Sequence, residues 1–120
     1  MKLADVIEVL EGKVISQEAD PNLEVTCVSA ADLMSDVLAF AEGGSILLTG
    51  LCNPQVVRTA EMADIIAIVF VRGKIPPSET VELAAKKGIP LIATKYTMFE
   101  MAGRLYEAGL RSCDISCRIT

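Results

Sequence analysis

Polar and cationic residues follow three apolar segments of the chain, each of which has the length and composition of a buried strand. Backbone amides, hydroxyls and cations are the groups with which proteins bind phosphates and carboxylates. None of the three following loops supplies a carboxylate before its helix begins, so in this acidic protein they predict a locally positive rim. The candidate anion-binding residues are Thr49, Gly50, Asn53, Arg72, Gly73, Lys74, Thr94, Lys95 and Thr97.

A plainer interpretation of the same residues stays open. Thr, Gly and Asn are the ordinary turn and cap residues of loops that lead from strands into helices. In that interpretation the three loop cations are solvated and bind nothing.

Sequence motifs for catalysis are missing from the chain. It contains no histidine, which excludes Ser-His and Cys-His catalysis. Neither Gly-x-x-x-x-Gly-Lys-Ser/Thr nor Gly-x-Gly-x-x-Gly occurs. Asp32 and Asp36 lie four residues apart, but at a helix start they are expected to face solvent, where nothing raises the pKa of a carboxyl for acid catalysis. We therefore expect a non-catalytic protein without a cofactor.

The cysteines offer a second kind of chemistry. Cys113 and Cys117 have a Cys-x-x-x-Cys spacing that could ligate zinc or an iron–sulfur cluster, or form a redox pair. A metal site would need further ligands from Cys27, Cys52 or a second chain. Otherwise all four are plain thiols of a reducing compartment, because their spacing is not that of a disulfide framework.

The three candidate loops each connect a predicted strand to a predicted helix, so the arrangement of these strand–loop–helix units decides where the loops lie. Strands are expected at 45–49, 64–71 and 89–94, and helices at 53–63, 76–88 and 98–108. Such units imply right-handed crossovers and a parallel sheet, whose carboxyl-terminal edge collects the loops. The uninterrupted apolar run at 64–71 predicts the centre of the sheet.

The N-terminal part adds further elements to the same sheet. A helix is expected at 3–11, strands at 13–16 and 23–29, and a helix at 30–40 that begins at a capping box formed by Ser29 and Asp32. The fold class is therefore α/β, a three-layer-like sandwich with a mainly parallel sheet. Residues 1–120 form one domain, with 111–120 as an edge strand or a flexible tail.

The net charge of the chain and the length of its apolar runs limit which partners it can have. A net charge of −5 disfavours nucleic acid and anionic membranes, and no apolar run is long enough to span a bilayer. Asp5 interrupts any signal peptide, so a cytoplasmic protein is expected. The apolar share is about 57% when glycine is counted and tyrosine left out, above the 45–50% of typical soluble domains. A short chain with excess apolar residues predicts a homodimer, with a further protein partner possible.

The order of these motifs resembles the DRTGG domain family. The resemblance covers about Val25 to Leu110 and rests on residues 29–38, Gly73, Gly88-Ile89-Pro90, Ala93-Thr94 and Thr97-Met98-Phe99. The family is similar in fold to the N-terminal domain of HPr kinase/phosphorylase, and its members also occur in phosphotransacetylases and in inorganic pyrophosphatases with CBS domains.

The resemblance implies an accessory regulatory or scaffold module, often at a dimer interface, whose own biochemical activity is undefined. Kinase activity is not expected, because the nucleotide-binding half of HPr kinase is not present in this sequence. Stand-alone members often lie near hydrogenase genes, so the alternative is a metal- or redox-handling accessory of such enzymes. The family motif has Asp and Arg after one strand and Thr-Gly-Gly after the next. This chain has Leu51-Cys52-Asn53 and Val71-Arg72-Gly73 there, so only Gly73 is kept.

Overall fold

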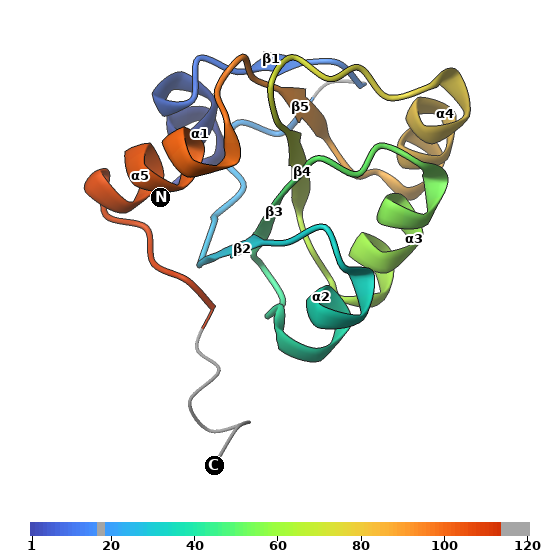
Figure 1. The fold of residues 1–120 in the computed structure, drawn as a ribbon, viewed down its shortest axis with the longest axis horizontal. Helices are drawn as coiled ribbons and strands as arrows, with labels where there is room; N and C mark the ends of the chain where they lie inside the picture. Colours follow the sequence, from blue (N-terminus) through green and yellow to red (C-terminus); the bar gives the residue numbers. More distant parts are fainter. Residues whose placement is uncertain (17–18, 114–120) are drawn as a thin grey trace.

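The computed structural model describes residues 1–16 and 19–113. Within these residues the chain alternates short helices and strands (Figure 1). The elements in chain order are α1 (Leu3–Val9), β1 (Lys13–Val14), β2 (Val28–Ala30), α2 (Met34–Phe40), β3 (Ile46–Thr49), α3 (Pro54–Met62), β4 (Ala67–Phe70), α4 (Ser78–Lys87), β5 (Leu91–Ala93) and α5 (Met98–Glu107).

One five-stranded sheet organises the molecule, with the strand order β1-β5-β4-β3-β2. Strands β2 to β5 are parallel, and β1 pairs antiparallel with β5. The predicted α/β class and the mainly parallel sheet are confirmed. Strand β4 lies at the centre, as its apolar run predicts, because a strand covered on both faces needs apolar side chains on both.

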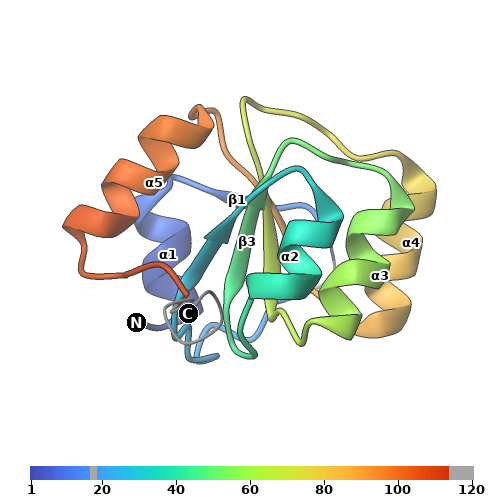
Figure 2. The ribbon, with the colours of Figure 1, turned by 60° about the horizontal axis from the view of Figure 1, so that its bottom comes forward.

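Helices cover both faces of the sheet (Figure 2). Helices α2, α3 and α4 lie on one face, since the chain moves across the sheet in a single direction from β2 to β5 and each crossover has the same hand. Helices α1 and α5 lie on the other face. The sheet has a hydrophobic core on each face, and successive strand residues point alternately into one core and the other. Leu48 and Val69 face α1 and α5, whereas Leu47 and Phe70 face the other three helices.

Local signals explain most of the element boundaries. Pro54 opens α3 at its first turn, and Gly88 ends α4 in the left-handed conformation with φ 69°. The hydroxyl of Thr97 accepts a hydrogen bond from the backbone N–H of Glu100 at 3.2 Å, so Thr97 caps α5.

The predicted helix start at Ser29 is wrong. Ser29 and Ala30 belong to β2 and pair with Leu47 and Leu48 of β3, and α2 begins only at Met34. Strand β2 is also shorter than the predicted 23–29, although Val25 and Cys27 are buried as the alternation indicates. Pairing with β3 prevails over the local capping pattern because it satisfies backbone groups of several residues at once.

The chain returns to the outer edge of the sheet after α5. The N–H of Val28 donates to the carbonyl of Arg111 at 2.9 Å, and that of Cys113 donates to the carbonyl of Val28 at 3.2 Å. Ser112 therefore bridges Val28 in parallel. Residues 114–120, to which the edge-strand prediction extends, lie outside the described residues. No helix within the described ranges has the length and apolar character needed to cross a membrane.

Candidate functional site

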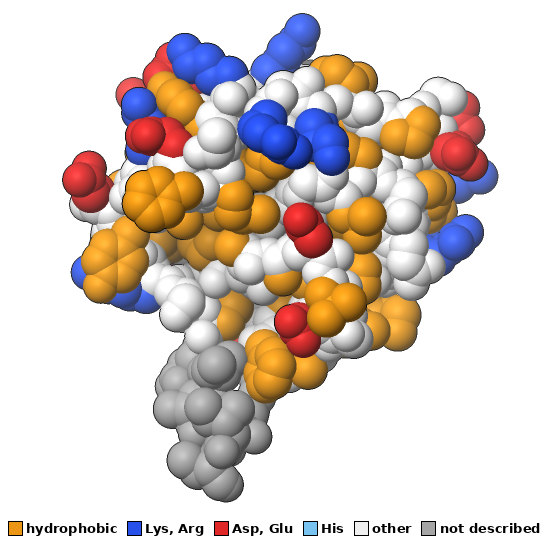
Figure 3. All heavy atoms as spheres, in the orientation of Figure 1, with side chains coloured by type: hydrophobic (Ala, Val, Ile, Leu, Met, Phe, Trp, Pro, Cys, Tyr) orange, Lys and Arg blue, Asp and Glu red, His pale blue; other side chains and the backbone are white. Residues whose placement is uncertain are grey.

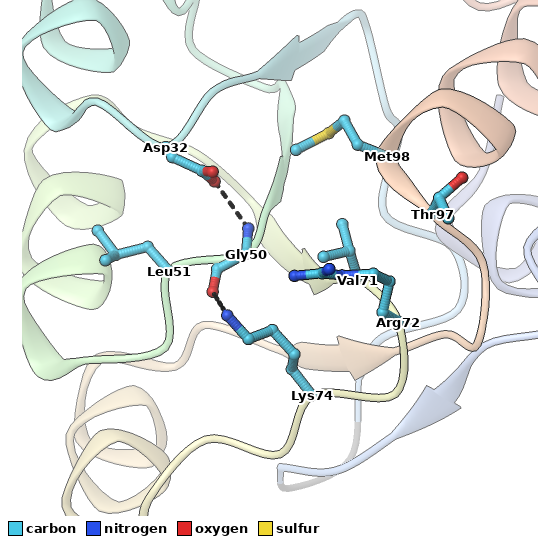
Figure 4. Close-up of a pocket in the computed structure, with 8 residues that line it drawn as sticks. All are labelled: Asp32, Gly50, Leu51, Val71, Arg72, Lys74, Thr97 and Met98. Atoms are coloured by element: carbon cyan, nitrogen blue, oxygen red, sulfur yellow. Dashed lines mark hydrogen bonds between the residues drawn. The ribbon is translucent and has the colours of Figure 1, made fainter.

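A cavity of about 510 Å³ opens at the carboxyl-terminal edge of the sheet, beside the first turn of α5. Strands β2, β3 and β4 lead into helices on one face, whereas β5 leads into α5 on the other, so the loops after β4 and β5 diverge (Figure 2). This is where open parallel sheets collect ligands. The cavity is lined by Asp32, Gly50, Leu51, Val71, Arg72, Lys74, Thr97 and Met98 (Figure 4).

Gly50 is held from two sides. Its N–H donates to Oδ1 of Asp32 at 2.8 Å, and its carbonyl oxygen accepts from Nζ of Lys74 at 2.6 Å (Figure 4). The buried hydroxyl of Thr49 donates to the same carboxylate oxygen at 2.9 Å. Together these bonds join the loops after β2, β3 and β4 at the floor of the cavity.

The carboxyl of Asp32 is stabilised in its charged form. The hydrogen bond from the N–H of Gly50 lowers the pKa of Asp32 below its usual value, and the Thr49 hydroxyl and the charges of Lys74 and Arg72 lower it further. Asp32 is therefore ionised at neutral pH, and the cavity carries two cations against one carboxylate. Its local charge is positive in a chain whose net charge is −5.

Arg72 extends into the cavity from a constrained backbone (Figure 4). Its φ of 53° is left-handed, a conformation that costs a non-glycine residue free energy and that tends to occur at functional sites. The N–H of Arg72 donates to the carbonyl of Tyr96 at 2.8 Å, and that of Gly73 donates to the carbonyl of Thr94 at 2.7 Å. Across residues 1–16 and 19–113, the guanidinium of Arg72 has no hydrogen-bond or ion-pair partner.

Helix α5 contributes its first turn to the cavity. Thr97 caps the helix and Met98 follows it, so the amino-terminal end of the ten-residue helix faces the same space as Arg72. The positive end of the helix dipole adds to the charge of the two cations.

Four of the nine predicted residues line the cavity: Gly50, Arg72, Lys74 and Thr97. Thr49 supports it from below through Asp32. Asn53 is exposed at the start of α3, and Gly73 forms the turn behind Arg72 with φ 66°.

The other two predicted residues make their contacts away from the cavity. The hydroxyl of Thr94 donates to the carbonyl of Leu10, the C-cap of α1, at 2.7 Å. Nζ of Lys95 lies 3.6 Å from a carboxylate oxygen of Glu11 and above the ring of Tyr96. Both residues therefore join the sheet edge to the turn that follows α1.

Sequence reasoning missed Asp32 as a member of the site. The capping pattern placed its carboxylate at a helix start, whereas it bonds to the N–H of Gly50, 18 residues later in the chain. The available signal was its position two residues after the end of β2, next to the loops that follow β3 and β4.

The model of the DRTGG domain family matches residues 5–108. The chain belongs to the DRTGG domain family. None of the curated proteins with which it was compared matches it. Among solved structures, this DRTGG domain is similar to the CBS and DRTGG domains of the regulatory region of Clostridium perfringens pyrophosphatase, complexed with the activator diadenosine tetraphosphate. The identity is 15% and the TM-score 0.66, over 99% of this chain and 50% of the other, so this chain spans about half the length of that region.

A left-handed turn lies where this DRTGG domain departs from the family motif. The resemblance puts Val71-Arg72-Gly73 where the family has Thr-Gly-Gly, and both Arg72 and Gly73 have positive φ. Glycine adopts this backbone at no steric cost, whereas arginine adopts it with strain. Arginine in place of glycine at position 72 therefore adds a guanidinium to the cavity but strains the backbone.

The described residues include three of the four cysteines of this DRTGG domain, and the predicted pair of Cys113 and Cys117 lies partly outside them. Cys113 lies against Cys27, with the two sulfur atoms 2.7 Å apart, and Cys117 lies outside the described residues. Cys52 is half-buried in the loop after β3. The residues that the structure describes contain no group of three or more cysteine or acidic side chains arranged to hold a metal ion.

Proposed function

We propose that this DRTGG domain is a non-catalytic regulatory module that binds a small phosphate-bearing anion in the cavity between Asp32, Arg72 and the start of α5. The observation that carries the proposal is the unpaired guanidinium of Arg72, held on a strained backbone beside Lys74 and a helix amino terminus. A planar guanidinium with free N–H groups is the donor best matched to phosphate oxygens.

The size and composition of the cavity support a small-molecule ligand. Its volume of about 510 Å³ falls in the usual range of such sites. Leu51, Val71 and Met98 supply apolar walls, on which the non-phosphate part of a ligand could pack. The Clostridium perfringens regulatory region is complexed with diadenosine tetraphosphate, and that ligand class is the first to test here.

A ligand screen tests the proposal. Thermal unfolding is followed with diadenosine tetraphosphate, ATP, acetyl phosphate and inorganic pyrophosphate, and adenosine serves as the uncharged control. A ligand that binds only the native state raises the unfolding temperature with its concentration. A rise with one of the phosphate compounds and none with adenosine supports the proposal, which fails if no phosphate compound raises the temperature up to millimolar concentration.

The second part of the proposal is that two copies of the chain associate through the face around the outer strand. Phe99 and Tyr106 of α5 are 88% and 60% exposed, and Leu33, before α2, is 60% exposed. An apolar hollow of about 280 Å³ lies between α5 and the edge of β2 and is lined by Ala30, Leu105 and Leu110 among others. Hydrophobic side chains gather over this face (Figure 3).

A symmetric dimer would cover these side chains and the apolar hollow together. Sedimentation equilibrium at micromolar protein is expected to give about twice the monomer mass. A single species of monomer mass over the whole concentration range would refute this part and leave the ligand proposal untouched.

A further inference from the structure

Cys27 and Cys113 lie 86 residues apart in the sequence and meet at the outer edge of the sheet. Their side chains are 6% and 7% exposed, and their sulfur atoms are 2.7 Å apart. A disulfide bond has a sulfur–sulfur length of about 2.0 Å, so only a small approach of the two side chains separates this contact from a covalent bond.

The backbone holds the two residues in place. Cys27 precedes Val28 and Cys113 follows Ser112, and Val28 and Ser112 form the parallel bridge between β2 and the segment after α5. Val28 and Ser112 line the apolar hollow beside α5. Because side chains alternate along extended chains, both cysteines point to the opposite side, toward each other.

We propose that Cys27 and Cys113 form a reversible disulfide bond that fastens the segment after α5 to the outer strand of the sheet. The oxidant is a low-molecular-weight disulfide. One thiol loses its proton, attacks the small disulfide and releases the first small thiolate, which leaves a mixed disulfide. The second cysteine then attacks the mixed disulfide and releases the second small thiolate. Two protein thiols and one small disulfide give one protein disulfide and two small thiols, and the two cysteine protons pass to the released thiolates.

The surroundings make this bond slow to form and stable once formed. Burial, the hydrogen bond with Cys113 and the nearby carboxylate of Glu42, 4.0 Å from the sulfur, raise the pKa of Cys27 to about 12. The hydroxyl of Thr26, at 3.8 Å, opposes the rise. Thiolate is therefore scarce at neutral pH, so the rate of oxidation is expected to increase with pH. A thiolate that is not stabilised in the reduced protein also favours the disulfide at equilibrium.

The test equilibrates the full chain in oxygen-free buffers of reduced and oxidised glutathione over a range of ratios. Free thiols are then blocked with an alkylating reagent, and the protein is analysed by intact mass and by peptide mapping. The expected result is the loss of two alkylation sites and a cross-linked peptide pair that contains Cys27 and Cys113. Cross-links that join Cys113 to Cys117 or Cys52, or no loss of thiols at the most oxidising ratio, would overturn the proposal.

Matched variants and a stability measurement complete the test. Cys52→Ser and Cys117→Ser are expected to keep the cross-link, whereas Cys27→Ala and Cys113→Ala lose it. Oxidation of the parent protein is expected to raise its unfolding temperature by about 5–15 °C, because the bond closes a long loop of the unfolded chain. An equal rise in Cys27→Ala would overturn the assignment. The unmutated protein gives the peptide map even if an alanine variant fails to fold.

Discussion

The N–H of Arg72 donates to the carbonyl oxygen of Tyr96 at 2.8 Å and thereby joins the loop after β4 to the loop after β5. The bond holds Arg72 in its left-handed conformation, from which the side chain extends into the cavity. Tyr96 is itself fixed, since its hydroxyl donates to Glu11 and the guanidinium of Arg104 lies 4.0 Å from its ring centroid. The position of the Arg72 cation thus depends on contacts that reach from the loop after β4 to the turn after α1 and to α5.

The first prediction concerns the two cations of the cavity. For any phosphate compound found by the screen, Arg72→Ala and Lys74→Ala are each expected to weaken binding about ten-fold or more, because each removes a charge-assisted hydrogen bond. Isothermal titration calorimetry measures the affinities. Lys95→Ala is the matched control, since Lys95 pairs with Glu11 instead. Equal affinity in the parent and both cavity variants would contradict the proposed site.

The second prediction separates the strain of Arg72 from its charge. Arg72→Gly is expected to raise the free energy of unfolding by about 0.5–1 kcal/mol, since the steric cost of a left-handed residue exceeds the entropy that glycine loses on folding. Urea unfolding measures the change. The same variant is expected to bind a phosphate compound as poorly as Arg72→Ala does. Arg72→Lys keeps the strain, so its stability should stay near that of the parent. A less stable glycine variant would show that the side chain supports the fold.

The third prediction is the pH dependence that Asp32 confers. The pKa of Asp32 is lowered in the folded protein, so its stabilisation is fully present above the unfolded value of about 4 and is lost as the pH falls through the folded value. Asp32→Ala is expected to lower the free energy of unfolding by about 1 kcal/mol at pH 7, a figure reduced for solvent screening because the side chain is exposed. Urea unfolding from pH 7 to pH 3 should show this difference shrinking at the acid end. A constant difference would mean that the carboxylate charge contributes nothing.

Sequence patterns could predict the elements whose signals are local. Three helix signals each act within one helical turn: the Pro at the start of α3, the Gly after α4 and the Thr97 cap. The uninterrupted apolar run of β4 likewise indicates, without any distant residue, that this strand is buried on both faces. The strands therefore assemble in the predicted way, and their loops meet at one edge. That edge brings Gly50, Arg72, Lys74 and Thr97 together.

Long-range pairing decides what the sequence could not predict. Asp32 enters the site because Ala30 pairs with Leu48, which sets its carboxylate beside Gly50. Lys95 leaves the site because Glu11, from a segment 84 residues earlier, lies within reach of its ammonium group. Cys113 meets Cys27 only because the chain returns to the sheet edge after α5. No local pattern encodes these contacts.

The last prediction concerns self-association and rests on Phe99. Its ring is 88% exposed in the first turn of α5, so Phe99→Glu places an acid at the positive end of the helix dipole and should leave the monomer as stable as the parent. In a dimer that buries this face, the same substitution places a charge in an apolar contact and should shift the equilibrium to monomer. Sedimentation equilibrium measures the shift. Met62→Glu, at a 69% exposed position on α3, is the control and should still dimerise. If Phe99→Glu dimerises as tightly as the control does, the interface lies elsewhere on the molecule.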